Sequence, residues 1–314
     1  MPRNWDFTPQ NDWMTSQSKA LTGAAFTTLL LIAFMMGANH VAARLAFNHG
    51  VDVVTAVTFR SSVTAFVVAL ILWQQKVPLQ LSSRQQKNLL WVGALIAVQS
   101  VCLYSSVARL PVALALLAFN TYPLLTAFWA RVLYAHRPER AVLMAMPLML
   151  VGLALALDVF GAASGLGAAA QWGQIGVGVA FALAASATFG LALVITQHET
   201  TEVDGRLRTF TSMLTVAVLA AAVASTQSGF HLPTAPVGWW GLGALTFLYG
   251  TAFTIMFTVL PKLGVVGNSA IMNVEPVFAL VLAWAVLDQS IALMQLLGAG
   301  VVVATVMWLG LRKR

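Results

Sequence analysis

The sequence predicts an all-α integral membrane protein whose ten transmembrane helices form two five-helix repeats of inverted topology. Of its 314 residues, 59% are hydrophobic and only 9% are charged, and the mean hydropathy is +0.83. A soluble protein of this composition would expose too much apolar surface to water. Residues 110–123 also recur as residues 263–276, with Leu, Val, Asn and Pro at matching positions, and the same shift of 153 aligns Gly37 with Gly190. These observations indicate a duplicated membrane domain.

The first repeat is predicted from five apolar runs within residues 20–160. The runs are 20–41, 52–74, 88–107, 111–134 and 141–160. Each is bounded by charges, prolines or polar clusters, and each approaches the length of about 20 residues that a helix needs to cross a bilayer. The first run follows a polar tail (1–19) and precedes nine others, which indicates a membrane span and not a cleaved signal peptide.

A Gly/Ala-rich connection (161–173) leads to the second repeat, residues 174–311. Its runs are 174–197, 207–227, 237–260, 265–287 and 291–311, and a basic C-terminus (312–314) follows. Because five crossings are an odd number, the second repeat must enter the bilayer from the opposite face. This layout is typical of secondary transporters, which bind their solute near the midplane between the repeats.

The net charge of +7 comes from basic residues between the apolar runs and at the end of the chain. That placement favours contact with anionic membrane lipids over nucleic acid. If both termini are cytoplasmic, 14 of the 17 Lys and Arg residues lie on the cytoplasmic side, as the positive-inside rule favours. One Cys and five scattered His make a metal site improbable, and without a phosphate-binding G-x-x-x-x-G-K-[ST] motif we expect no nucleotide or other cofactor.

Two ionisable residues lie inside predicted spans, where a charge is costly and therefore a candidate for function. Glu275, in span nine, precedes Pro276, which frees a backbone carbonyl near the carboxyl group. Glu275 could exchange protons or gate solute, or it could be a structural acid that pairs with Arg60 or bonds to a neighbouring helix. Arg60, in span two, could bind a solute carboxylate or extend along its helix toward the interface.

Asn120 and Asn273 occupy equivalent places in the two repeats, each three residues before an equivalent proline, Pro123 or Pro276. They could share a role in solute binding or only cross-link helices. On a straight helix, residues two apart point about 200° away from each other. Asn273 and Glu275 can therefore face one site only if Pro276 breaks the helix.

Polar and aromatic residues in other spans complete the candidate site. Asn39 and His40 make span one an interior helix, in which His40 could move protons or only donate a hydrogen bond. An aromatic, hydrogen-bonding wall for an amphipathic solute, or else ordinary core, could be formed by Tyr104, Tyr122, Tyr249 and Gln99. The glycines at 298 and 300 permit a close helix contact within the chain or with a second copy, so the protein is expected to be a monomer or a homodimer.

These segments resemble the EamA branch of the drug/metabolite transporter (DMT) superfamily, over about residues 21–311. The similar stretches are Gly37–Arg44, Thr58–Arg60 and the proline-centred repeats at Pro123 and Val274–Phe278, together with the ten spans. The resemblance implies a proton- or gradient-coupled carrier in the bacterial inner (plasma) membrane, often an exporter of amino acids, related metabolites or amphipathic drugs. Family members usually end spans four and nine with Gly-Glu, where this chain has Ala-His at 135–136 and Asp-Gln at 288–289.

We therefore expect a secondary transporter that moves a small metabolite, such as an amino acid or a related amphipathic solute, by alternating access, with efflux as the expected direction. Spans one, three, four, six, eight and nine are expected to enclose its site. The alternatives are an uptake carrier or multidrug exporter of the same fold, a passive pore, or a membrane-embedded enzyme. An enzyme is disfavoured because the sequence offers one central acid and no nucleophile paired with a base.

Overall fold

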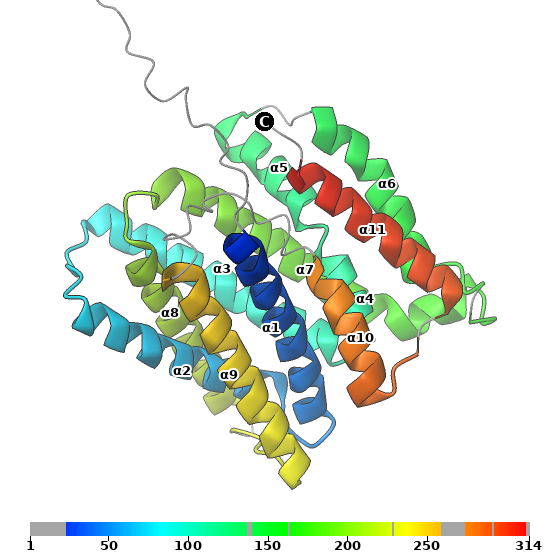
Figure 1. Ribbon diagram of the computed structural model, residues 1–314, viewed down its shortest axis with the longest axis horizontal. Coiled ribbons are helices and arrows are strands. Elements are labelled where there is room, and N and C mark those ends of the chain that lie inside the picture. Colours follow the sequence, from blue (N-terminus) through cyan, green and yellow to red (C-terminus); the bar gives the residue numbers. More distant parts are fainter. Residues whose placement is uncertain are drawn as a thin grey trace, which may run out of the picture.

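Helices are the regular secondary structure of the chain throughout the residues that the structure describes. The computed structural model describes residues 23–136, 140–162, 164–227, 229–258, 274–290 and 292–311. Its helices are α1 (Gly23–Phe47), α2 (Val53–Gln74), α3 (Ser83–Val107), α4 (Val112–Phe119), α5 (Tyr122–Tyr134), α6 (Arg140–Ala156), α7 (Ala168–Glu199), α8 (Gly205–Thr226), α9 (Pro236–Thr258), α10 (Glu275–Leu287) and α11 (Leu293–Leu311) (Figure 1). Since α4 and α5 together occupy predicted span four, these helices account for ten spans.

The lengths of the helices, and the apolar side chains that they expose, are those expected in a lipid bilayer. Six stretches of the described residues are long and apolar enough to span a membrane, namely Phe26–Phe47, Val53–Gln74, Ser83–Val107, Val112–Tyr134, Ala168–Glu199 and Gly205–Thr226. Large apolar side chains also face outward, among them Trp73 at 77% exposure and Trp240 at 78%. Such faces would be a liability in water and are expected against lipid. The protein is therefore a multi-pass membrane protein.

Several helices extend beyond the apolar runs that predicted them. α3 begins at Ser83, five residues before its run, because Ser82 and Gln85 form a capping box that satisfies the first backbone N–H groups. α1 continues to Phe47, past the predicted end at residue 41. α7 begins at Ala168, inside the predicted connection, where three alanines favour helix. Apolar periodicity locates the lipid-embedded part of a helix but misses its polar or small-residue ends.

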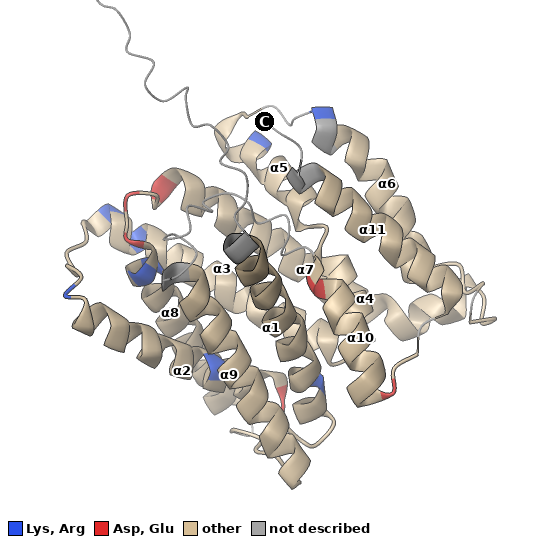
Figure 2. Cartoon of the chain, viewed as in Figure 1, with Lys and Arg blue, Asp and Glu red and all other residues tan. Residues whose placement is uncertain are grey.

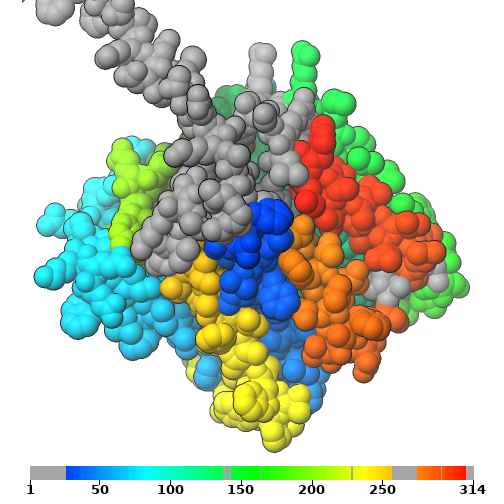
Figure 3. Space-filling model, in the orientation of Figure 1, coloured from blue at the N-terminus to red at the C-terminus, as the bar shows by residue number. Residues whose placement is uncertain are grey.

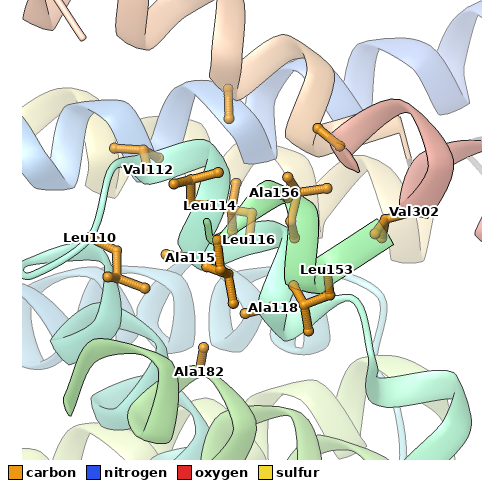
Figure 4. Close-up of a cluster of buried hydrophobic side chains, with 14 of the residues drawn as sticks. Leu110, Val112, Leu114, Ala115, Leu116, Ala118, Leu153, Ala156, Ala182 and Val302 are labelled. Carbon is orange, nitrogen blue, oxygen red and sulfur yellow. The ribbon is translucent and has the colours of Figure 1, made fainter. Parts of the chain in front are cut away.

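Predicted span four is interrupted between α4 and α5. α4 ends at Phe119, and the hydroxyl of Thr121 donates to the carbonyl of Ala118 at 2.8 Å. α5 then begins at Tyr122 with Pro123 in its first turn, where the missing N–H of proline has no cost. α4 is buried along nearly its whole length and forms a large part of the main hydrophobic core, together with Leu153, Ala156, Ala182 and Val302 from α6, α7 and α11 (Figure 4).

The bounds of α10 show the internal duplication in three dimensions. α10 spans Glu275–Leu287, which is α5 shifted by 153 residues at both ends. Pro276 lies in its first turn as Pro123 does in α5, and both helices end at a left-handed residue, Ala135 with φ 54° and Asp288 with φ 53°. The helix-breaking positions expected at both prolines are helix starts in the structure.

Two glycines show that the repeats are related by a pseudo-twofold axis. A Cβ on Gly37 of α1 would lie 3.0 Å from the backbone nitrogen of Ala279 in α10. A Cβ on Gly190 of α7 would lie 2.9 Å from the backbone nitrogen of Thr126 in α5. Because 37 + 153 = 190 and 126 + 153 = 279, the two contacts exchange when the repeats are exchanged. Only glycine permits such close backbone approach.

The remaining helices pack in the same exchanged manner. α1 packs against α9 as α7 packs against α3, while α2 faces α8 and α6 faces α11, which are pairs of equivalent helices. Figures 1 and 3 both show α1 lying between α9 and α10. The two repeats therefore interlock through most of their helices, and the centre of the molecule is built from both.

Candidate solute-binding site

The side chains of His40 and Glu275 are in contact between the two repeats. Nε2 of His40 in α1 lies 3.3 Å from Oε1 of Glu275, the first residue of α10. Gly37, one turn before His40, allows α10 to come this close. The carboxylate also lies at a helix N-terminus, where the helix dipole favours negative charge. Of the two structural partners offered for Glu275, Arg60 and a neighbouring helix, the structure shows the contact with a neighbouring helix, α1.

Arg60 instead lies between two aromatic rings. Its side chain in α2 is buried, at 3% exposure, and its Cζ is 3.9 Å from the ring centre of Tyr249 in α9 and 4.4 Å from that of Tyr104 in α3. Guanidinium groups bind the faces of tyrosine rings electrostatically. Arg60 therefore points into the protein and does not extend toward the interface. Span two, absent from the helices expected to enclose the site, contributes to it.

Tyr104 connects these groups into one cluster. Its hydroxyl donates a hydrogen bond of 2.9 Å to Oδ1 of Asn39, and its ring meets that of His40 edge-on at 5.6 Å. The same ring contacts Arg60. The central polar cluster, defined as Asn39, His40, Arg60, Tyr104, Tyr249 and Glu275, thus draws on α1, α2, α3, α9 and α10.

The central polar cluster has unused hydrogen-bonding capacity. Asn39 is fully buried and His40 is 2% exposed. Nδ2 of Asn39, Nδ1 of His40 and Nε of Arg60 are buried without a hydrogen-bond partner among the described residues. Buried polar atoms are usually paired, so three such atoms in one cluster call for a ligand, water or a rearrangement.

The position equivalent to Glu275 in the first repeat is Tyr122, because 122 + 153 = 275. Tyr122 packs with Phe119 and Phe189, at ring separations of 5.6 and 5.1 Å. The second repeat thus places an acid at the start of α10, and the first repeat an aromatic group at the start of α5.

Among the described residues, Asn120 and Gln99 form no hydrogen bond with the central polar cluster. Asn120 is buried at the end of α4. Gln99 of α3 is partly buried and accepts a long hydrogen bond, 3.4 Å, from its neighbour Ser100. Asn273 lies outside the described residues, so its pairing with Asn120 stays a prediction.

A second polar cluster, which the sequence did not single out, joins the ends of α5 and α7 to α3. Glu199 accepts hydrogen bonds from Arg84 at 2.6 Å, Tyr134 at 3.2 Å and Asn88 at 3.3 Å. His198 stacks on Tyr134 at 3.9 Å. The only sequence signal was an acid at the end of a long apolar run, which is typical of an interface. Figure 2 shows the general pattern, with charges mostly at helix ends and few within helices.

Comparison with known proteins agrees with this architecture. A solved structure described only as "Crystal structure of protein" aligns with a TM-score of 0.59 and 16% sequence identity, covering 90% of this chain and 95% of that one. At that identity the likeness establishes the fold alone. No curated protein matches the sequence. The family model of the EamA-like transporter family matches residues 23–157 and 176–311, one copy in each repeat. The chain therefore belongs to the EamA-like transporter family, the assignment that its ten spans and repeated motifs predicted.

Proposed function

We propose that the protein is a proton-coupled secondary transporter that exports a small metabolite by alternating access. The observation that carries the proposal is the central polar cluster, which lies where two interlocked repeats meet and includes an acid at the start of α10, the equivalent of the half-helix α5. Secondary transporters built from inverted repeats bind solutes at such discontinuous helices. The monomer supplies every residue of the cluster.

Alternating access follows from the exchange of contacts between repeats. The contact of α1 with α10 and that of α7 with α5 are equivalent in backbone geometry but differ in side chains. If the repeats exchange their conformations, the contact that opens on one side closes on the other. The Arg84–Glu199 contact between α3 and α7 is absent from the equivalent pair, Val237 and Ala46, which gives the two sides different closing interactions.

Proton coupling is assigned to the His40–Glu275 pair. A proton on Glu275 removes the negative charge that attracts His40, and so weakens the link between α1 and α10. Proton binding and helix separation then favour each other, as linkage requires.

Proteoliposomes with a trapped pH-sensitive dye test this function. Amino acids, nucleosides and cationic amphiphiles are added in turn, and solute-dependent proton movement is recorded with and without an imposed pH gradient. We expect Glu275→Gln to retain solute counterflow but lose its response to pH. Asp288→Asn, which removes the acid at the other end of α10, is the matched control and should keep both.

Three outcomes would contradict the proposal. An unchanged pH profile in Glu275→Gln removes the coupling role. Conductance without saturation or counterflow indicates a pore. Product formation without solute flux indicates an enzyme. The direction is tested separately, by comparing solute retention in cells that express the protein with retention in cells that do not; faster loss is expected for an exporter, and greater accumulation indicates uptake.

A further inference from the structure

We propose that the transported solute carries a carboxylate group, which Arg60 and Asn39 bind beside Tyr104 and Tyr249. This inference rests on the transport function proposed above and names the chemistry of its solute. It is carried by the unpaired groups of the central polar cluster.

Arg60 is a buried cation without a carboxylate partner among the described residues. The salt bridges of those residues involve other groups, and Glu275 is engaged by His40. The two tyrosine rings compensate the charge only in part, since a ring quadrupole is weaker than a full counter-charge. A buried charge is costly without a counter-ion. A bound anion would supply the counter-charge that the described residues do not provide.

Asn39 adds a second donor that contacts the same tyrosine, Tyr104. Because its Oδ1 accepts from the hydroxyl of Tyr104, its amide nitrogen must provide the remaining contacts, and that nitrogen has no partner. Arg60 Nε is likewise unpaired. Both residues contact Tyr104, which places two donors and one positive charge around a single side chain. Such a combination favours a ligand group that only accepts hydrogen bonds and carries negative charge.

The charge balance favours a carboxylate over a phosphate. The central polar cluster contains one permanent cation, Arg60, and the negative charge of Glu275 lies beyond Tyr104 and His40. A single carboxylate neutralises Arg60 and matches its planar donors. A phosphate dianion would exceed the single positive charge of Arg60, and an organic cation would be repelled by it.

Thermal unfolding of the purified protein, with acids compared to their own amides, tests the inference. The probes are lactate, 3-phenylpropionate, L-leucine and L-phenylalanine, each paired with its primary amide. Ligands that bind the folded state raise the unfolding temperature. We expect at least one acid to stabilise the protein with an affinity about tenfold or more above that of its amide, the difference typical of a charged hydrogen bond.

Variants of the protein test which residue is responsible for acid binding. Arg60→Met should abolish the stabilisation by acids. Arg109→Met, which removes an exposed arginine stacked on Phe181 at 4.9 Å, should retain it and is the matched control. Asn39→Asp places a carboxylate next to Tyr104 as an internal counter-ion. This variant should therefore fold but lose the stabilisation by acids. It provides the test if Arg60→Met does not fold.

Each result bears on one proposal. Equal binding of acids and amides, a response in folded Asn39→Asp, or no acid-specific stabilisation across the panel overturns the carboxylate assignment. Proton-coupled flux of an amide or a cation would then leave the transport function standing. Acid-specific binding without flux in proteoliposomes overturns transport and leaves the carboxylate site in place.

Discussion

Tyr104 is the residue on which the central polar cluster depends, because its hydroxyl and its ring act separately. The hydroxyl holds Asn39, whereas the ring contacts Arg60 and His40. Tyr104→Phe removes the hydroxyl alone and leaves Oδ1 of a fully buried Asn39 without its donor. An unsatisfied buried acceptor costs about 1–3 kcal/mol. We expect a loss of folding free energy of that size in denaturant titrations of the detergent-solubilised protein.

Tyr249→Phe is the natural comparison. The hydroxyl of Tyr249 lies 3.7 Å from the sulfur of Met213, a weak acceptor, while its ring also stacks on Arg60. Loss of the Tyr249 hydroxyl should cost less than about 1 kcal/mol, because a typical neutral hydrogen bond contributes about that much and sulfur is a weak acceptor. Equal destabilisation by both substitutions would show that the Asn39 bond does not organise the cluster.

At the scale of helices, Gly298 and Gly300 of α11 allow the effect of helix packing on stability to be distinguished from that of helix propensity. A Cβ on Gly298 of α11 would lie 2.4 Å from the backbone nitrogen of Ala156 and 2.6 Å from the carbonyl of Gly152, both in α6. Nothing lies within 4 Å of a Cβ on Gly300. The sequence predicted a close helix contact either within the chain or with a second copy. At Gly298 this contact is made within the chain.

Gly298→Ala should therefore destabilise the protein, by about 1–3 kcal/mol, because α11 and α6 must move apart to admit the methyl group. Gly300→Ala should be neutral or slightly stabilising, because alanine is the better helix former. Unfolding curves of the two variants under identical conditions measure the difference. Similar behaviour of both would mean that α6 and α11 are less tightly packed than described.

The helices and their equivalence were predictable, whereas the contacts between side chains were not. Apolar runs and the shift of 153 residues defined the spans and the matching starts of α5 and α10. Periodicity along one helix does not state which neighbour it faces. From the sequence, Arg60 was therefore one suggested partner of Glu275, because both residues are charged. In the structure, Gly37 allows α10 to approach α1, and the partner is His40. Tyr104 was named, but its link to Asn39 required the packing of α1 on α3.

For the whole molecule, the placement of basic residues predicts its orientation in the membrane. The loop between α1 and α2 and the loop between α2 and α3 must lie on opposite sides, because α2 crosses the bilayer. Positive charges are enriched on the cytoplasmic side. The α2–α3 loop and the start of α3 carry Lys76, Arg84 and Lys87, whereas the last turn of α1 and the α1–α2 loop, residues 48–52, carry only Arg44. The former is expected to be cytoplasmic, together with both termini.

Single cysteines in these loops test the orientation. The natural cysteine is first removed by Cys102→Ala, and Asn48→Cys or Gln75→Cys is then introduced, both at exposed positions. In right-side-out membrane vesicles, a membrane-impermeant maleimide should label Asn48→Cys at once and Gln75→Cys only after permeabilisation. The reversed pattern would place the termini outside. Labelling of both positions before permeabilisation would contradict α2 as a membrane span, and with it the odd number of crossings that inverts the second repeat.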